Sequence, residues 1–365
     1  LKIWTLILIF MSFYYPFSFI NNKKDIIFTL KTLYASLLFI LAYGYIQIYS
    51  LFATDSIIFQ IYMYFQKILN YGWIEMTNNY NLVPQIHMIN RIILTNQEPS
   101  IAAYVLQTLF YPFLLSSILV SVNIIKNKKR IFELILFILS IPVLIFTFSS
   151  AGFVVLLFQL LLVIIMLLYF TKKDIKRYSY FFLLFIFVSL ILAIFIMRHD
   201  TLYLNTRTAI DKIFISGPGE GSAETRYGTI IAGLKEFLHF PLLGVGLGNS
   251  KYFFNQFIPD WALNSEVLSY ITTKHALTPR SMWIRLLAET GIIGIFPFLF
   301  FIFTIIKNYL SLIKKSNRNK YNEFLFCSFF IFLLAFFIHG FNVPSFFIVF
   351  QWTLLGFFAV SYEIR

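Results

Sequence analysis

The C-terminal half of the chain contains one long polar gap between apolar segments. Within it lies RYGTIIAGLKEFLHFPLLGVGLGNS (residues 226–250), and at its end TPRSMWIRLLAETGIIG (residues 278–294) runs into an apolar helix. Arg226, Arg280 and Arg285 all fall in these two pieces. The flanking segments are long and apolar, so we expect them to form a scaffold that holds this stretch against a bilayer surface.

The composition identifies the broad class. Of the 365 residues, 59% are hydrophobic and 12% are charged, whereas a soluble domain has about 45–50% apolar and about 25% charged residues. We therefore predict an all-α, polytopic membrane protein. The net charge of +13 would suggest nucleic acid in a soluble protein. Here the basic residues gather in short loops, as is typical of cytoplasmic loops, so no nucleic-acid partner is expected.

The apolar segments predict about nine transmembrane helices in a single transmembrane domain over residues 1–365. The segments are residues 3–20, 26–52, 101–125, 131–148, 153–170, 180–197, 282–306, 324–338 and 343–360. Residues 56–69 are expected to form an amphipathic helix at the membrane interface. A sharp turn is expected at residues 149–152.

The clustered Lys and Arg residues predict the orientation. With nine spans, the basic clusters at residues 23–24, 126–130, 172–177 and 307–320 fall on one side, which the positive-inside rule makes cytoplasmic. The long loops at residues 55–99 and 198–281 are then extracytoplasmic, and so is the N-terminus. That last arrangement is less common, and a missing N-terminal span would explain it.

Arginines on the outer side are unexpected under the positive-inside rule, so they need an explanation. The guanidinium group binds phosphate through a planar fork of donors, and two such groups would suit an enzyme that handles a diphosphate-linked lipid. The alternative for each arginine is contact with lipid headgroups. We favour that alternative for Arg198 and Arg207. For Arg226, which opens a helix-like run at residues 227–240, both interpretations stay open.

The polar gap contains further candidates. Gly244 and Gly246 follow a proline without the spacing or the strand of a nucleotide site, so they predict a helix end and a tight re-entry loop that approaches a ligand. Ser281 is a possible N-cap. Glu289 is a functional or pairing candidate at membrane depth, and pairing with Arg285 four residues away is the plainer interpretation.

The general base has several candidates. His275 suits the role by type, because imidazole titrates near neutral pH, although a lone loop histidine is more often simply solvated. No cluster has metal-ligand spacing, so neither a metal nor a cofactor is predicted.

These residues resemble the O-antigen ligase/polymerase family of bacterial membrane proteins. The resemblance lies in Arg226, PLLGVG (residues 241–246), RS (residues 280–281) and LLAETGIIG (residues 286–294), and also in residues 98–100 and, more weakly, 149–152. It implies a metal-independent glycosyltransferase with a GT-C-like fold in the bacterial inner membrane. The reaction implied is polymerisation of undecaprenyl-diphosphate-linked oligosaccharide units into O-antigen, capsule or exopolysaccharide. A flippase and chain-length regulator proteins are the implied partners, beside the bilayer.

Arg226 matches a family arginine that is taken to hold the diphosphate. The ligases carry a histidine where this chain has Arg280, which weakens the ligase interpretation and leaves His275, Glu98 and Glu289 as possible bases. The catalytic candidates are Arg226, Arg280, His275 and Glu289, and the substrate-binding candidates are Arg91, Glu98, Arg207, Arg285, Gly244 and Gly246. The alternatives are a ligase of the same family and a polysaccharide transporter or flippase.

Overall fold

The described part of the chain is helical throughout. The computed structural model describes residues 2–53, 56–69, 92–94, 99–120, 130–170, 222–264, 267–268, 271, 278–315, 319–343 and 348–363. Within these ranges there is no strand, which confirms the predicted all-α class. Many of these helices are apolar, as a bilayer requires, and a helix satisfies its backbone groups internally in lipid.

Several helices are apolar and long enough to cross a membrane. Among the described residues four qualify by length and composition: Lys23–Phe52, Pro99–Val120, Met282–Leu312 and Lys320–Gly340. Shorter apolar helices lie at Ile7–Phe19, Ile131–Phe146 and Ala151–Leu167. The chain is thus a membrane protein by its helices, while nine spans, the GT-C-like fold and the single domain stay predictions. The sixth predicted span, residues 180–197, lies outside the described residues.

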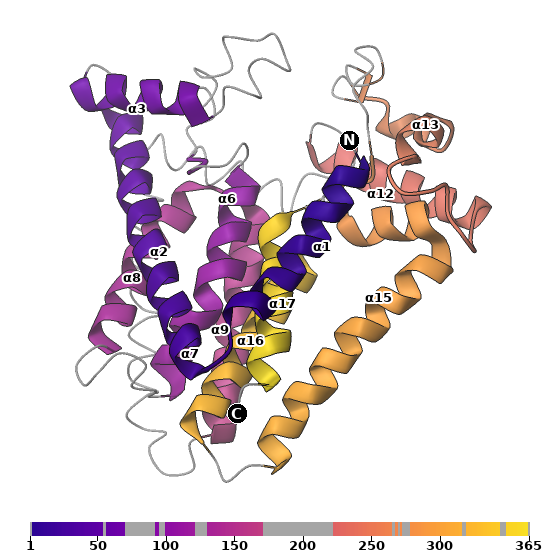
Figure 1. Ribbon diagram of the computed structural model, residues 1–365. Coiled ribbons are helices and arrows are strands. Elements are labelled where there is room, and N and C mark those ends of the chain that lie inside the picture. Colours follow the sequence, from indigo (N-terminus) through magenta and orange to yellow (C-terminus); the bar gives the residue numbers. More distant parts are fainter. Residues whose placement is uncertain are drawn as a thin grey trace. The chain divides into compact units, whose positions relative to one another are not determined.

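The chain divides into two units, and the first contains most of the C-terminal half. It comprises Leu1–Ile26, Phe214–Phe329 and Phe336–Arg365. Its helices are α1 (Lys2–Phe19), α12 (Ser222–His239), α13 (Ser250–Phe253), α15 (Met282–Lys315), most of α16 (Lys320–Gly340) and α17 (Val349–Glu363), with short 3-10 turns η3 (Phe254–Gln256) and η4 (Asp260–Ala262). The helix α1 packs along α17 (Figure 1), where a Cβ on Gly356 would meet the carbonyl oxygen of Phe13.

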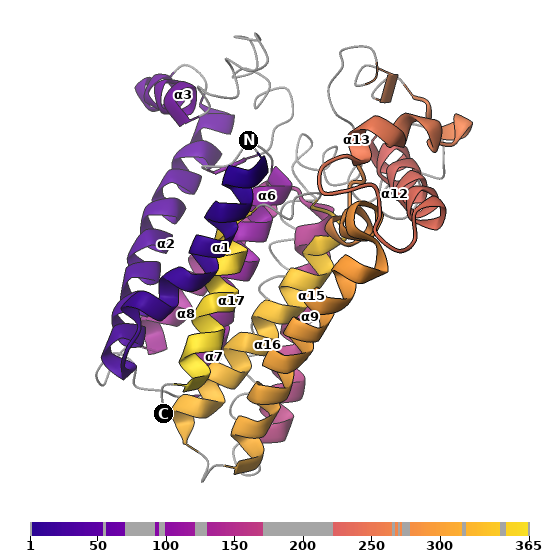
Figure 2. The same cartoon turned by 45° about the vertical axis from the view of Figure 1, so that its right-hand side comes forward.

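The helix α15 is broken at Gly291, which the sequence did not reveal. Gly291 has φ 60° and ψ −164°, a conformation open almost only to glycine. Residues 282–290 form a first stretch, and residues 292–315 form a long apolar arm in a different direction (Figures 1 and 2). The predicted seventh span is therefore two helices, and the arm alone reaches roughly 35 Å, enough to cross the hydrocarbon core.

A loop at residues 240–248, which we call the capping loop, supplies hydrogen bonds to both sides of the break. A helix end leaves carbonyl or N–H groups without intrahelical partners. The N–H groups of Val245 and Gly246 donate to the carbonyl oxygens of Ala288 (3.0 Å) and Glu289 (2.8 Å). Beyond the break, Ile292 N–H donates to Pro241 at 2.9 Å, and Ile293 N–H donates to Leu242 at 3.1 Å.

The predicted helix end and tight loop are confirmed by the backbone, while approach of the loop to a ligand stays a prediction. Gly244, Gly246 and Gly248 have positive φ values of 63°, 90° and 69°. At Gly244 a Cβ would also lie 2.5 Å from the carbonyl oxygen of Ala288. The glycines thus let the loop lie directly against the broken helix, which a side chain would prevent.

The second unit comprises Ile27–Ile213 and Phe330–Ala335. Its helices are α2 (Lys23–Phe52), α3 (Ile57–Leu69), α6 (Pro99–Val105), the π-helical turn η2 (Leu106–Phe110), α7 (Tyr111–Val120), α8 (Arg130–Phe146) and α9 (Ser150–Phe170). Buried glutamines connect η2 with α9, since Gln107 Nε2 donates to the Gly152 carbonyl at 2.6 Å and Gln159 Nε2 donates to the Gln107 carbonyl at 2.8 Å. The widened turn at η2 leaves that carbonyl available.

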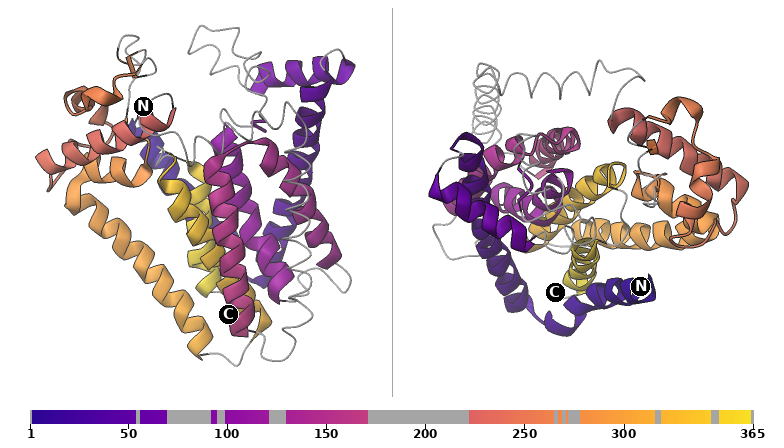
Figure 3. Two further views of the ribbon diagram at one scale, coloured as in Figure 1. Left: turned by 180° about the vertical axis from the view of Figure 1, so that it is seen from behind. Right: turned by 90° about the horizontal axis from the view of Figure 1, so that it is seen from above.

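Two smaller predictions concern the second unit. The chain turns between α8 and α9 at residues 147–149, so the turn predicted at residues 149–152 is placed too late and residues 150–152 begin α9, where Gly152 N–H donates to Ser149 Oγ at 3.2 Å. The predicted amphipathic helix forms as α3, which lies across the end of α2 (Figures 1 and 3). Its place at the membrane interface stays a prediction.

We expect Gly291→Ala to destabilise the protein by about 3 kcal/mol or more, because alanine strongly disfavours this backbone conformation. Its Cβ would also lie 2.3 Å from the Leu242 carbonyl oxygen. Thermal unfolding of the purified protein in detergent micelles measures the loss. The neighbouring Ile292→Ala, at an exposed position, should stay within about 1 kcal/mol of the unsubstituted protein. Equal unfolding temperatures for the two variants would contradict this account of the break.

Candidate functional site

The helix α12 and the first stretch of α15 run side by side in the same direction. At one end Arg280 N–H donates to Thr229 Oγ1 at 3.3 Å, and at the other Val245, just after α12, bonds to Ala288. Between these ends a Cβ on Gly233 would lie 2.7 Å from a side-chain carbon of Ile284. The small residue therefore permits close packing, and residues 226 and 280 lie at the same end of the pair.

Thr229 links the backbones of Arg226 and Arg280. Its hydroxyl donates to the Arg226 carbonyl oxygen at 2.8 Å and accepts the backbone N–H of Arg280 at 3.3 Å. Thr229 is buried, and both arginines are half-buried. The structure thus brings together the two arginines that the sequence singled out, although more than fifty residues separate them along the chain.

Polar groups at the end of α16 complete the surroundings of this arginine pair. The Arg226 guanidinium donates to the side-chain oxygen of Asn342. The hydroxyl of Ser281 donates to the Gly340 carbonyl oxygen at 3.2 Å and accepts the N–H of Ile284 at 3.5 Å, consistent with the predicted N-cap. The partial positive charge at the N-terminus of α15 therefore lies beside Arg280. A helix N-terminus next to an arginine is suited to bind an anion.

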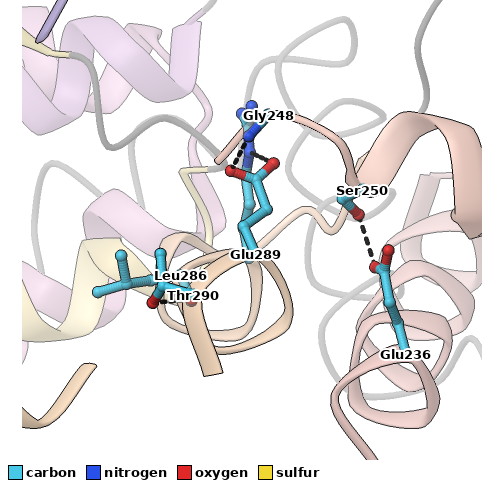
Figure 4. Close-up of polar contacts among 7 residues, drawn as sticks. Glu236, Gly248, Ser250, Leu286, Glu289 and Thr290 are labelled. Carbon is cyan, nitrogen blue, oxygen red and sulfur yellow. Dashed lines mark hydrogen bonds and ion pairs between the residues drawn. The ribbon is translucent and has the colours of Figure 1, made fainter. Parts of the chain in front are cut away.

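Arg285 and Glu289 pair with each other, as the plainer interpretation predicted. The Arg285 Nε lies 2.9 Å from Glu289 Oε1. The second carboxylate oxygen accepts the N–H of Gly248 at 2.6 Å (Figure 4). Glu289 is 2% exposed, so this carboxylate holds the capping loop and Arg285 in one buried contact. Because both of its oxygens are engaged, the geometry favours a positioning role over proton transfer.

Glu236 is a second buried carboxylate, and sequence reasoning missed it. Its Oε2 accepts the hydroxyl of Ser250 at 2.6 Å (Figure 4). Burial raises the pKa of Glu236 to about 7, the Ser250 hydrogen bond opposes the shift, and the charge of Glu289 adds to it. A signal was present in the sequence, because Glu236 shares one helix face with Thr229, Ala232 and Gly233.

The remaining predicted site residues lie either in the capping loop or outside the described part of the chain. Gly244 and Gly246 lie in the capping loop, where their backbone conformation shapes the loop. His275, Arg91, Glu98 and Arg207 lie outside the described residues. Among the described residues no group of three or more His, Cys, Asp or Glu side chains could hold a metal ion.

The family model for O-antigen ligase matches residues 135–299, somewhat under half of the chain. The predicted resemblance to the O-antigen ligase/polymerase family is confirmed. The match contains α12, the capping loop and the first stretch of α15, and so includes Arg226, Arg280 and the Glu289 contact. The O-antigen ligase family acts on lipid-linked glycans in the membrane. No curated protein and no solved structure matches the chain.

Substitution of Glu289 should separate its two contacts. We expect Glu289→Ala to cost about 2–4 kcal/mol, because it removes both the ion pair and the acceptor for Gly248. Glu289→Gln should cost less, since its amide oxygen still accepts the Gly248 N–H. Thermal unfolding in micelles gives both values, with Asp260→Asn, at an exposed position, as the control. If Glu289→Ala unfolds at the temperature of the control, the contact does not stabilise this unit.

The raised pKa of Glu236 predicts a pH dependence of stability. A carboxyl group with a folded pKa near 7 and an unfolded pKa near 4.5 binds more protons in the folded state between those values, so stability falls as pH rises through that window. Each pKa unit corresponds to about 1.4 kcal/mol, so up to about 3 kcal/mol should be lost. The variant Glu236→Gln should lack this part of the decline when unfolding is followed from pH 4.5 to pH 8. Identical pH profiles for the two proteins would refute the assignment.

Proposed function

We propose that this protein is a membrane glycosyltransferase that polymerises undecaprenyl-diphosphate-linked oligosaccharide repeat units into O-antigen, capsule or exopolysaccharide. The growing chain on its lipid diphosphate is the donor, and a hydroxyl at the non-reducing end of a new unit is the acceptor. The long loops face outward from the bacterial inner membrane, so both lipid-linked substrates reach the site from the bilayer.

This proposal rests mainly on the two hydrogen bonds by which the Thr229 hydroxyl connects the backbones of Arg226 and Arg280. These contacts are made by backbone groups, and they place both residues beside the N-terminus of α15. In this proposal the two guanidinium groups at that helix end bind one diphosphate. A diphosphate leaving group develops negative charge as the glycosidic bond breaks, and preorganised donors stabilise that charge without rearrangement. The bidentate geometry of arginine matches phosphate oxygens.

The acceptor hydroxyl must lose a proton in the same reaction. His275, which the sequence singled out for this step, is the base in this proposal, with Glu98 as the other candidate. Glu289 is the weaker choice, since its oxygens are occupied by Arg285 and Gly248. Arg226 and Arg280 bind the donor diphosphate, and Arg285 lies one to two turns further along the same stretch of α15.

A ligase of the same family is the second candidate, because the family match supports ligases and polymerases alike. A transporter is less well supported. Proteins that move polar cargo keep ionisable residues at membrane depth in several spans. The described candidate span Pro99–Val120 has no Lys, Arg, Asp or Glu, and the same holds for residues 324–340 of α16. In Met282–Leu312 the residues Arg285 and Glu289 lie near the start and pair with each other. The arginine pair lies instead where helices begin.

Glycan analysis in cells that carry Arg226→Ala or Arg280→Ala tests the proposal, with protein level checked. We expect chain elongation to fall at least about 100-fold, the typical effect of removing one group that stabilises a developing oxyanion. Arg226→Lys should recover part of the activity, because it keeps the charge without the fork. Lys307→Ala, which removes a positive charge from the long arm of α15, serves as the control.

The products separate the candidate functions. Single repeat units at the surface without long chains indicate a polymerase, and polymer that stays on its lipid carrier indicates a ligase. Unchanged chain length and attachment, with the variant proteins present, would contradict the role of the arginine pair.

A further inference from the structure

The helix α12 exposes an apolar stripe. Tyr227, Leu234 and Leu238 are 61%, 37% and 70% exposed, and their spacing of seven and four residues places them on one face of a helix. The opposite face is buried, with Ala232 and Glu236 at 0% exposure. A contiguous apolar face on an otherwise well-packed helix marks an interaction surface.

The capping loop continues this surface in a fixed conformation. Leu242 and Leu243 are 63% and 68% exposed. They lie in a loop whose backbone forms hydrogen bonds across the break in α15, including those from Ile292 to Pro241 and from Ile293 to Leu242. The loop therefore holds its apolar side chains outward and cannot fold them into the interior without losing these bonds.

The exposed leucines adjoin the start of the apolar arm of α15. Ile292, Ile293 and Phe296 are 49%, 56% and 66% exposed, and they begin the long arm that is a candidate membrane span. Because the Leu242 carbonyl bonds to Ile293 N–H, the loop and the first turn of the arm present one continuous apolar surface. Lipid that covers the arm would reach the loop as well.

The polar residues around this surface match the chemistry of a bilayer interface. Between residues 235 and 253 the acidic side chain is Glu236, which is buried, while Lys235 is exposed and Lys251 is half-buried. Tyr252 is 68% exposed. Lysine complements anionic headgroups, and tyrosine is enriched where apolar and aqueous regions meet.

We propose that Leu238, Leu242 and Leu243 form a wedge that is inserted into the bilayer leaflet which the arm of α15 enters, with Lys235, Lys251 and Tyr252 at headgroup level. The helix α12 and the first stretch of α15 then lie along the membrane surface, and both run across the direction of the arm in Figures 1 and 3. This placement holds the arginine pair at the depth of lipid phosphates. It does not rest on the proposed function and stands even for a transporter.

Depth measurement with spin labels tests the wedge. Single cysteines are introduced as Leu243→Cys and Leu238→Cys in a Cys327→Ser background, since Cys327 is the one native cysteine. The labelled protein is placed in vesicles of phosphatidylethanolamine and phosphatidylglycerol. Collision rates are then measured with oxygen, which enters lipid, and with a water-soluble nickel chelate. Phe296→Cys on the arm is the lipid reference, and Asn255→Cys, at an exposed position in η3, is the water reference.

We expect labels at positions 238 and 243 to give oxygen-to-nickel collision ratios close to that at position 296 and several-fold above that at position 255. Ratios close to that at position 255 would overturn the proposal. So would labels that neither reagent reaches and that broaden each other's spectra, because a second copy of the chain would then cover the face. Arginine variants that abolish polymerisation without changing these ratios would leave the wedge in place, so the two proposals fail separately.

Discussion

The first unit depends on one constraint, the break of α15 at Gly291. The capping loop forms hydrogen bonds to both sides of that break. A helix interrupted near a bilayer leaves carbonyl and N–H groups that neither lipid nor the helix itself can satisfy. The capping loop supplies backbone partners for Ala288, Glu289, Ile292 and Ile293. Only glycine permits such close approach, so the glycines of the loop and Gly291 are required together.

This contact determines where the polar residues lie. Since the loop follows α12 and bonds to the end of the first stretch of α15, it fixes the two helices side by side and in parallel. Arg226 and Arg280 then meet at Thr229 at one end of the pair. At the other end, Glu236 and Glu289 hold Ser250 and Gly248. The two arginines and the two buried carboxylates thus lie at opposite ends of one helical layer.

The same layer has two features that suit a lipid-linked anionic group. Its cationic end combines fixed positive charge with a helix N-terminus, which suits an anionic group carried by a lipid. Its apolar face, formed by leucines of α12 and of the capping loop, would bring that end to the depth of phosphate groups. The O-antigen ligase match covers this whole layer, in agreement with a substrate that is held in the membrane.

The amino-acid sequence by itself determined the class of the protein, most helix positions and the residues of interest. Apolar composition, helical spacing and glycine clusters act locally, so the all-α class, the Arg285–Glu289 pair, the Ser281 cap and the tight loop at Gly244 and Gly246 were predictable. The tertiary structure alone decided that α15 breaks at Gly291, that Thr229 joins Arg226 to Arg280, and that Glu236 is buried beside Ser250. Each of these depends on contacts between segments that are distant in the chain. A periodic pattern of residues does not indicate which distant backbone groups will form hydrogen bonds with the unpaired N–H and carbonyl groups of a broken helix.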